Sequence, residues 1–195
     1  RTMGYLPIWA LWGKEAHCMI GNHAIPVIVD AYLKGFRGFD VEEAYAAIRG
    51  SSTVSHQHSD WEVYDRYGYY PFDIIPKESV SRTLESAYDD YCVAQMAKSL
   101  DEMWDFEYFM KRSGYYKNLF DPETKFMRGK DSKGNWRTPF RAMRLFHAGA
   151  VGGDFTEGNS WQYTWHVQQD VEGLIELMGG KDGRRNERCS CSGTS

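Results

Sequence analysis

The sequence predicts an all-α fold, in which helical hairpins joined by long loops form a toroid or solenoid. Apolar residues recur three and four positions apart in five segments, as on one face of an amphipathic helix. No segment reads convincingly as a buried strand. The stretches between the helices are rich in aromatic and charged residues, and we expect them to gather at one end and form a site.

The first two predicted helices are residues 23–34, which Gly35 is placed to end, and residues 41–49. Asp40 is a suitable N-cap for the second helix, and Gly50 closes it. The short connection between them suits a helical hairpin.

The third predicted helix is the clearest, because its apolar residues recur at spacings of four, three, four and three. They are Val80, Leu84, Ala87, Tyr91 and Ala94. We expect Ser79 or Ser81 to cap this helix. Asp89 and Asp90 are predicted to be a solvated pair on its polar face.

Residues 101–113 form the fourth predicted helix, which ends at Gly114, and residues 160–178 form the fifth, which ends at two glycines. Residues 51–76 and 120–156 are predicted to be irregular. A loop as long as the second is usually functional in a compact domain.

Composition excludes several classes of protein. The chain has 195 residues and 22.5 kDa, enough for one globular domain with its own core. Its 23 basic and 27 acidic residues give no basic field for nucleic acid, and no apolar run approaches the roughly 20 residues of a membrane span. The chain opens on Arg1 with no signal peptide before its first motif, and we expect the natural start to lie upstream.

Aromatic residues are abundant, with 7 Trp, 13 Tyr and 10 Phe, and they serve either a core or a surface on which sugar rings stack. Cys18 and Cys92 lie in apolar patterns and are predicted to be buried thiols. Cys189 and Cys191 lie in a polar tail and are too few for a structural zinc site.

Glu157 stands just before an aromatic helix start. Neighbouring tryptophans could desolvate its carboxyl, raise its pKa and make it a general acid. Alternatively, Glu157 is a carboxylate that favours the helix dipole, with Asn159 as the N-cap.

Two other groups could carry chemistry. Glu15 and His17 project the same way from an extended segment, so they either bind a ligand hydroxyl or form a structural pair. His56, His58 and Asp60 have the residue types of a metal site, but they lack a recognisable further ligand, and a solvated loop is the favoured interpretation.

Several longer segments resemble, in this order, one known family. They are GYLPIWALWGKEAHCMIG at residues 4–21, PVIVDAY at 26–32, SRTLESAYDDY at 81–91, YKNLFDP at 116–122, FMRGKD at 126–131, NWRTPF at 135–140 and EGNSWQYTW at 157–165. The family is glycoside hydrolase family 92, the calcium-dependent exo-acting alpha-mannosidases common in gut Bacteroidetes. The resemblance covers residues 4–180.

The resemblance implies that residues 1–180 belong to an (α/α)6 barrel catalytic domain, of which this chain holds an incomplete, all-α part. It implies that an N-terminal β-sandwich domain and the C-terminal half of the barrel are missing from this sequence. Residues 181–195 show no helical pattern, and we expect this polar tail to come from a frameshift or a truncation.

The resemblance also implies the hydrolysis of terminal alpha-linked mannose with inversion. The enzyme would be alpha-1,2-mannosidase-like and would degrade mannose-containing glycans, including N-glycans, in the periplasm or outside the cell. One carboxylic acid then protonates the leaving oxygen while another carboxylate activates water on the opposite face of the sugar. Glu157 matches the acid. The residues that match sugar contacts are Trp12, Glu15, His17, Asn159, Trp161 and Gln162.

Calcium would bind the mannose hydroxyls, and its main ligands would lie downstream of these residues, so no metal ligand is assigned. The family's general base lies in a Gly-Asn-Asp-Asp-like motif that this sequence lacks. We therefore expect the chain alone to hydrolyse no mannoside. Two other functions stay open: a non-catalytic helical carbohydrate-binding or scaffold protein, and a metal hydrolase built on His56 and His58.

Overall fold

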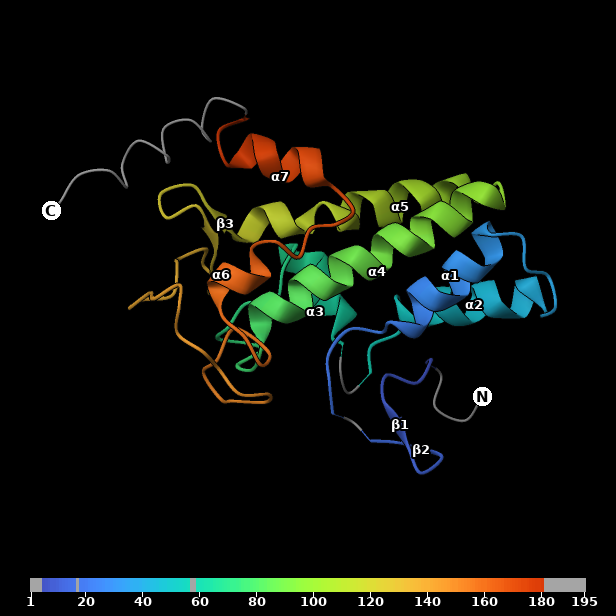
Figure 1. Cartoon of the computed structure of the whole chain (residues 1–195), viewed down its shortest axis with the longest axis horizontal. Coiled ribbons are helices and arrows are strands. Elements are labelled where there is room, and N and C mark those ends of the chain that lie inside the picture. Colours follow the sequence, from blue (N-terminus) through green and yellow to red (C-terminus); the bar gives the residue numbers. More distant parts are fainter. Residues whose placement is uncertain (1–4, 17, 57–58, 181–195) are drawn as a thin grey trace, which may run out of the picture.

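The computed structural model describes residues 5–16, 18–56 and 59–180, and this part of the chain is mostly helical, as the sequence predicts (Figure 1). Its helices are α1 (Ala24–Leu33), α2 (Val41–Ser51), α3 (Trp61–Tyr67), α4 (Ser79–Ser99), α5 (Met103–Ser113), the 3-10 helix η1 (Tyr115–Leu119), α6 (Ser160–Tyr163) and α7 (Val171–Leu177). Two antiparallel hairpins pair β1 (Ala10–Leu11) with β2 (Lys14–Glu15) and β3 (Phe120–Asp121) with β4 (Phe126–Met127). None of the described helices is long and apolar enough to cross a bilayer.

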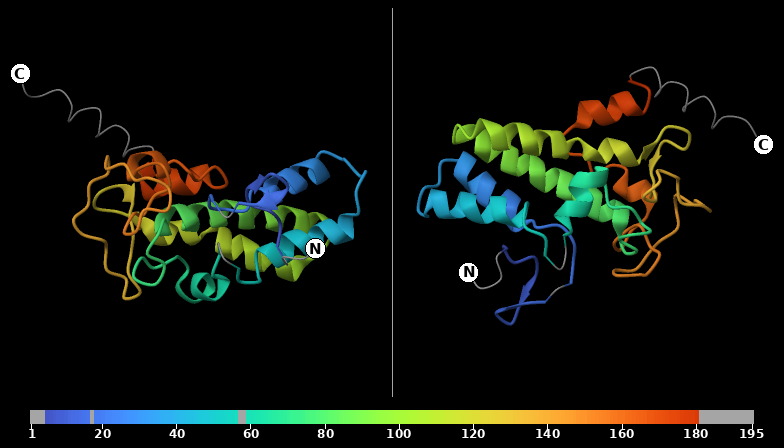
Figure 2. Two further views of the ribbon diagram at one scale, coloured as in Figure 1. Left: turned by 90° about the horizontal axis from the view of Figure 1, so that it is seen from below. Right: turned by 180° about the vertical axis from the view of Figure 1, so that it is seen from behind.

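The long helix α4 lies at the centre of the molecule and packs on α1, α2, α5 and η1 (Figures 1 and 2). Its C-terminal half shares one core with the first two helices and α5, through residues such as Val93 and Phe109. Its N-terminal half shares a second core with the β3–β4 hairpin and α7, through Leu84, Met127 and Leu174. One helix therefore joins two cores and is buried on nearly all sides.

This burial overturns two predictions about α4. Its N-cap is Glu78, with φ 58°, whereas Ser79 and Ser81 lie buried inside the helix. Asp89 and Asp90 are not a solvated pair, because both are buried. A buried carboxylate is costly without a partner, so the polar residues of α4 must be paired inside the protein.

The most enclosed of these pairs joins α4 to α5. Arg112 is fully buried, and its Nε and Nη2 lie 2.9 and 3.1 Å from the two carboxylate oxygens of Asp90. The guanidinium carbon lies 4.5 Å from the ring centre of Trp61 and 5.1 Å from that of Tyr64. Burial is the largest single influence on the pKa of Arg112 and lowers it, but Asp90 together with Tyr64, Tyr108 and Asp65 outweighs burial and raises that pKa. The ion pair joins α5 to α4, and the contacts of Arg112 with the two rings join both helices to α3.

The helix boundaries agree with the prediction for α1 and α5, and they differ elsewhere. Asp40 caps α2 as predicted, but the helix continues through Gly50. The single helix predicted over residues 160–178 is wrong, because it is broken into α6 and α7. The hydroxyl of Thr164 accepts a backbone N–H of β4, and the carboxylate of Asp170 caps a new helix by accepting the N–H of its third residue.

The stretch of residues 51–76 contains a helix that the sequence analysis missed. Asp60 caps α3, and Gly68 ends it with φ 70°. The indole Nε1 of Trp61 donates to the backbone oxygen of Ser51 at 2.9 Å. This aromatic stretch therefore forms part of the core rather than a loop.

The long loop of residues 128–159 lies at the N-terminal end of α4, beside the loop of residues 68–78 (Figure 1). Backbone hydrogen bonds join the two loops. The backbone oxygen of Asp154 accepts the N–H groups of Val80 and Ser81, at 3.0 and 3.1 Å, which fixes the loop to the start of the helix. The loops of residues 68–78 and 128–159 therefore share one end of α4, whereas the rest of the predicted loop of residues 51–76 contains α3.

Candidate functional site

The β1–β2 hairpin carries two of the predicted sugar-contact residues. Trp12 stands at its turn with φ 54° and is 93% exposed. The carboxylate of Glu15 accepts the N–H groups of Ile8 and Trp9, at 2.6 and 3.1 Å. His17 lies outside the described residues. The hydrogen bonds of Glu15 therefore hold the hairpin to the segment before it. The indole of Trp12 is accessible to a ligand.

A turn just before α6 carries the predicted general acid, and we call residues 156–158 the Glu157 turn. Glu157 is exposed and has φ 45°, which is unusual for a residue with a side chain. The N–H of the buried Thr156 donates to the hydroxyl of Ser81 at 2.9 Å. The backbone oxygen of Gly158 accepts an N–H of the preceding loop at 3.0 Å. The structure does not enclose the Glu157 carboxyl among tryptophans, because that side chain reaches solvent.

The residues after the Glu157 turn form a capping box. The Oδ1 of Asn159 accepts the N–H of Gln162 at 2.9 Å, and the Oε1 of Gln162 accepts the N–H of Asn159 at 3.1 Å. The prediction that Asn159 is the N-cap is confirmed. Both residues were also predicted to contact sugar. Their side-chain oxygens accept backbone N–H groups, and the sugar contact stays a prediction.

Two indoles are accessible beside the Glu157 turn. Trp161 and Trp165 are 49% and 55% exposed, and their rings lie 6.5 Å apart in an edge-to-face arrangement. Such flat apolar faces with a polar N–H are suited to ligands that are partly apolar and partly wet.

A chain of side chains links the Glu157 turn to the N-terminal segment. The hydroxyl of Tyr163 lies 3.2 Å from the backbone oxygen of Thr156 and 3.3 Å from Oε1 of Glu85. The Oε2 of Glu85 lies 2.7 Å from Nε2 of His23, and the Nδ1 of His23 lies 3.0 Å from Oδ1 of Asp89. The N-terminal segment therefore meets α4 at His23, and α6 meets the same helix at Glu85.

The charges of this cluster follow from its contacts. Hydrogen bonds to Asp89 and then Glu85 raise the pKa of His23 to about 10, so the imidazolium donates to both carboxylates at neutral pH. Burial raises the pKa of Tyr163 to about 12, so its hydroxyl stays a donor. Burial lowers the pKa of His166, whose ring lies 5.9 Å from that of Tyr163. The sequence analysis missed the cluster, although the four-residue spacing of Glu85 and Asp89 on one helix face was a usable signal.

The metal hypothesis for the histidine-rich loop gains no support. His56 stacks on Tyr5 with ring centres 4.1 Å apart, and it exchanges backbone hydrogen bonds with Ser59. Asp60 caps α3 instead of facing a metal, and His58 lies outside the described residues. Across residues 5–16, 18–56 and 59–180, no group of three or more His, Cys, Asp or Glu is placed to hold a metal ion. The residues present in that part of the chain therefore do not fit a calcium site.

Of the two cysteines predicted to be buried, one is buried and the other is exposed. Cys18 is exposed rather than buried. Cys92 is buried as predicted, and burial raises the pKa of its thiol to about 12. Cys189 and Cys191 lie outside the described residues.

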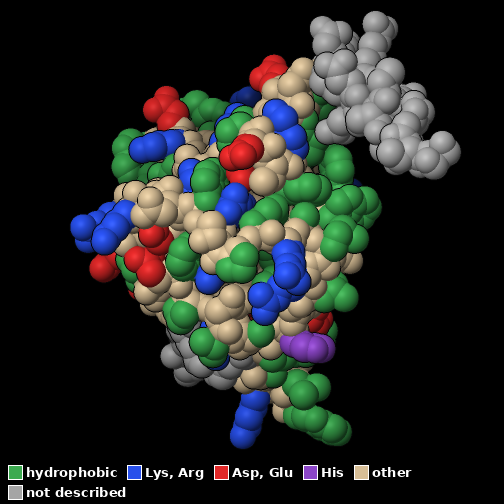
Figure 3. Space-filling model, turned by 90° about the vertical axis from the view of Figure 1, so that its left-hand side faces the viewer, with side chains coloured by type: hydrophobic (Ala, Val, Ile, Leu, Met, Phe, Trp, Pro, Cys, Tyr) green, Lys and Arg blue, Asp and Glu red, His purple; other side chains and the backbone are tan. Residues whose placement is uncertain are grey.

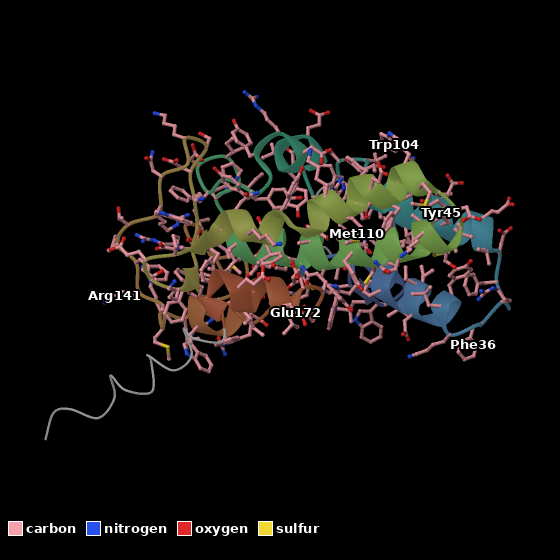
Figure 4. The ribbon with its side chains drawn as sticks, turned by 90° about the horizontal axis from the view of Figure 1, so that it is seen from above. Phe36, Tyr45, Trp104, Met110, Arg141 and Glu172 are labelled. Atoms are coloured by element: carbon pink, nitrogen blue, oxygen red, sulfur yellow. The ribbon has the colours of Figure 1, made fainter. Side chains whose placement is uncertain are left out.

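Hollows lie at both ends of the molecule. A cavity of about 180 Å³ adjoins the long loop, between Arg141 and Asp154. A groove of about 800 Å³ lies at the far end, between α2 and the start of α5, near Tyr45 and Trp104 (Figure 4). Basic and apolar side chains share the face made by the loops (Figure 3). The cavity, rather than the groove, shares its loop with the Glu157 turn.

The chain is similar to known proteins over nearly all of its length. The profile of the glycosyl hydrolase family 92 catalytic domain matches residues 1–187. A curated relative from Arthroderma benhamiae, called an uncharacterized secreted glycosidase, is 29% identical in an alignment 214 positions long, which covers 93% of this chain and 27% of the relative.

Solved structures of family GH92 are also similar. An alpha-mannosidase from Bacteroides thetaiotaomicron in complex with mannoimidazole is 47% identical, with a TM-score of 0.87, over 95% of this chain and 24% of that chain. An inverting mannosidase from Bacteroides thetaiotaomicron VPI-5482 is 39% identical, with a TM-score of 0.84, over 94% of this chain and 25% of that chain. The chain thus spans about a quarter of the length of these relatives.

Proposed function

The chain belongs to glycosyl hydrolase family 92, and from this we propose that it supplies the general-acid side of an exo-alpha-mannosidase active site. The observation that carries the proposal is the Glu157 turn, which presents an exposed carboxyl next to accessible indoles at the loop end of the helices. The likeness to an alpha-mannosidase structure that contains mannoimidazole supports a mannoside as substrate.

In the proposed reaction, Glu157 donates its proton to the oxygen of the departing group as the bond to the mannose C1 breaks. A second carboxylate, from outside these 195 residues, removes a proton from water that attacks the opposite face. Two such carboxyl groups stand about 6.5–9.5 Å apart in inverting enzymes, which leaves room for the water. We propose terminal alpha-1,2-linked mannose of glycans as the substrate, with Trp12 and Trp161 against the sugars.

The same proposal extends to the whole protein. We infer that the α1–α2 and α4–α5 hairpins are parts of an (α/α)6 barrel, that residues 1–180 belong to it, and that a β-sandwich domain precedes it. Because the described residues do not fit a calcium site, the main ligands of the calcium would lie downstream, and no step is assigned to it. The secreted glycosidase among the relatives supports a periplasmic or extracellular location.

Complementation tests the proposal. The chain is joined to the downstream part of the Bacteroides thetaiotaomicron alpha-mannosidase domain, and hydrolysis of 4-nitrophenyl alpha-mannoside and of an alpha-1,2-linked mannobiose is measured. We expect turnover from the joined protein, no turnover from the chain alone, and loss of mannobiose turnover in Glu157→Gln. Glu172→Gln is the matched control, because Glu172 is an exposed glutamate on α7 (Figure 4).

Three results would each contradict a part of this proposal. Full mannobiose turnover in Glu157→Gln would remove the acid role from that residue. A joined protein that binds mannosides but never hydrolyses them would favour the non-catalytic carbohydrate-binding alternative. Turnover by the chain alone would instead show that it carries its own base.

A further inference from the structure

The backbone of the Glu157 turn has a conformation that its own sequence does not favour. Glu157 has φ 45°, a region that glycine adopts readily and residues with a side chain adopt rarely. Such a conformation persists where the surrounding structure fixes it, and it is often found at functional sites. The question is therefore which residues fix this turn.

Tyr163 contacts the turn from the C-terminal end of α6. Its hydroxyl lies 3.2 Å from the backbone oxygen of Thr156, on one side of Glu157. Its ring edge lies under Gly158, on the other side, where a Cβ would come within 3.1 Å of Tyr163 Cε2. One side chain therefore contacts both neighbours of Glu157.

The position of Tyr163 is itself set by buried charges. Its hydroxyl lies 3.3 Å from Oε1 of Glu85, which is 8% exposed on the central helix α4. The other oxygen of Glu85 is 2.7 Å from His23, which also lies 3.0 Å from the buried Asp89. Because His23 donates to both carboxylates, Oε1 of Glu85 remains free of His23 and shares the single O–H of Tyr163 with the backbone oxygen of Thr156.

We propose that Tyr163, Glu85 and His23 are positioning residues for Glu157, acting through the Thr156 carbonyl and the Gly158 contact. This proposal rests on the general-acid role of Glu157 proposed above. None of the three residues needs to touch the substrate. Their effect is to keep the carboxyl of Glu157 aimed at the leaving oxygen, and a misplacement of about 1 Å can cost on the order of 100-fold in rate.

A first experiment uses the chain itself and needs no activity. Endoproteinase Glu-C cleaves after glutamate and requires an extended backbone, so the fixed turn should resist cleavage after Glu157 under native conditions. We expect Tyr163→Phe and Glu85→Gln to speed cleavage at this bond by at least about 10-fold. Tyr45→Phe is the matched control, because Tyr45 also donates to a carboxylate, Asp105 at 2.8 Å, but lies at the far end of the molecule (Figure 4).

A second experiment uses the joined protein described above and two mannosides that differ in leaving group. Mannobiose has a poor leaving group that needs protonation, whereas 2,4-dinitrophenyl alpha-mannoside has one that departs without it. We expect Tyr163→Phe to lower kcat about 10- to 100-fold on mannobiose, with KM little changed, and to lower it less than about 3-fold on the dinitrophenyl substrate. Tyr45→Phe should leave kcat unchanged on both substrates.

The outcomes separate the two proposals. Equal losses on both substrates, or unchanged Glu-C cleavage in Tyr163→Phe and Glu85→Gln, would overturn the positioning role while leaving the acid role intact. If Glu157→Gln itself keeps full activity on mannobiose, the acid role fails, and faster Glu-C cleavage would then show only that Tyr163 and Glu85 fix the turn.

Discussion

The buried pair of Arg112 and Asp90 gives a prediction whose size can be worked out from the structure. Arg112→Met removes the guanidinium but keeps an unbranched, flexible side chain that can fill much of the space. The change leaves the carboxylate of Asp90 buried without its bidentate partner, and it also removes the cation from above the rings of Trp61 and Tyr64. Removing one partner of a buried ion pair costs about 3–5 kcal/mol of unfolding free energy, and we expect a loss in this range.

The chain offers a matched control for this substitution. Lys34 also pairs with an aspartate, Asp30, at 2.7 Å, but both side chains are exposed, at 65% and 61%. Lys34→Met should therefore cost only about 0–1 kcal/mol. Urea denaturation of each purified chain, followed by circular dichroism at neutral pH, measures both losses.

A double variant tests the cause. Asp90→Leu combined with Arg112→Met removes both charges, so it should recover most of the stability lost in Arg112→Met alone. Equal losses for Arg112→Met and Lys34→Met would refute the reasoning from burial. A double variant as unstable as the single one would show that packing, rather than the unpaired carboxylate, sets the cost.

Three further predictions concern the candidate site. Hydrogen bonds to Asp89 and Glu85 raise the pKa of His23 to about 10 on folding, so its stabilising effect is complete below about pH 6.5 and is lost as the pH rises through 10. Because 46% of the His23 side chain is exposed, we discount the effect to about 1–2 kcal/mol, seen as the difference between wild type and His23→Gln in urea melts from pH 6 to 10. Asn159→Ala removes the N-cap of α6 and should cost about 1 kcal/mol in the same assay. Trp12→Ala, at a position 93% exposed, should change stability by less than about 0.5 kcal/mol.

Each of these predictions has a contrary result. Parallel pH profiles for wild type and His23→Gln would show that the imidazolium does not stabilise the fold. An unchanged stability in Asn159→Ala would mean that the capping box adds nothing. A loss above about 1 kcal/mol in Trp12→Ala would make Trp12 a structural residue rather than a candidate sugar contact.

The spacing of apolar residues predicted those helices well that have one buried face and one face exposed to solvent. The helices α1 and α5 have that character, and their predicted bounds nearly match. After Ser160 the apolar spacing continues without a break, but the carboxylate of Asp170 caps a separate helix, so the spacing there indicates one helix where there are two. A pattern of apolar residues does not show which polar side chain will bind a backbone N–H, because that depends on where the rest of the chain lies.

The same limit explains the errors on α4. Ser, Asp and Glu residues on a helix suggest a solvated face, and in isolation Asp89 and Asp90 would lie on one. The α1–α2 hairpin, α5 and the loops cover that face instead, and ion pairs with His23 and Arg112 compensate the buried charges. These partners lie 22 to 66 residues away in the sequence, so no local spacing could reveal them.

The sequence by itself determined the helical class, the family, and the residue types at the site, including Glu157 with its N-cap Asn159. These features depend on local spacing and on the order of motifs, which a sequence contains directly. The tertiary structure alone decided that Glu157 is exposed on a turn with φ 45°, and that Tyr163, Glu85 and His23 meet behind that turn. Such contacts form between segments distant in the chain, because the packing of both around one buried helix brings them within hydrogen-bond distance.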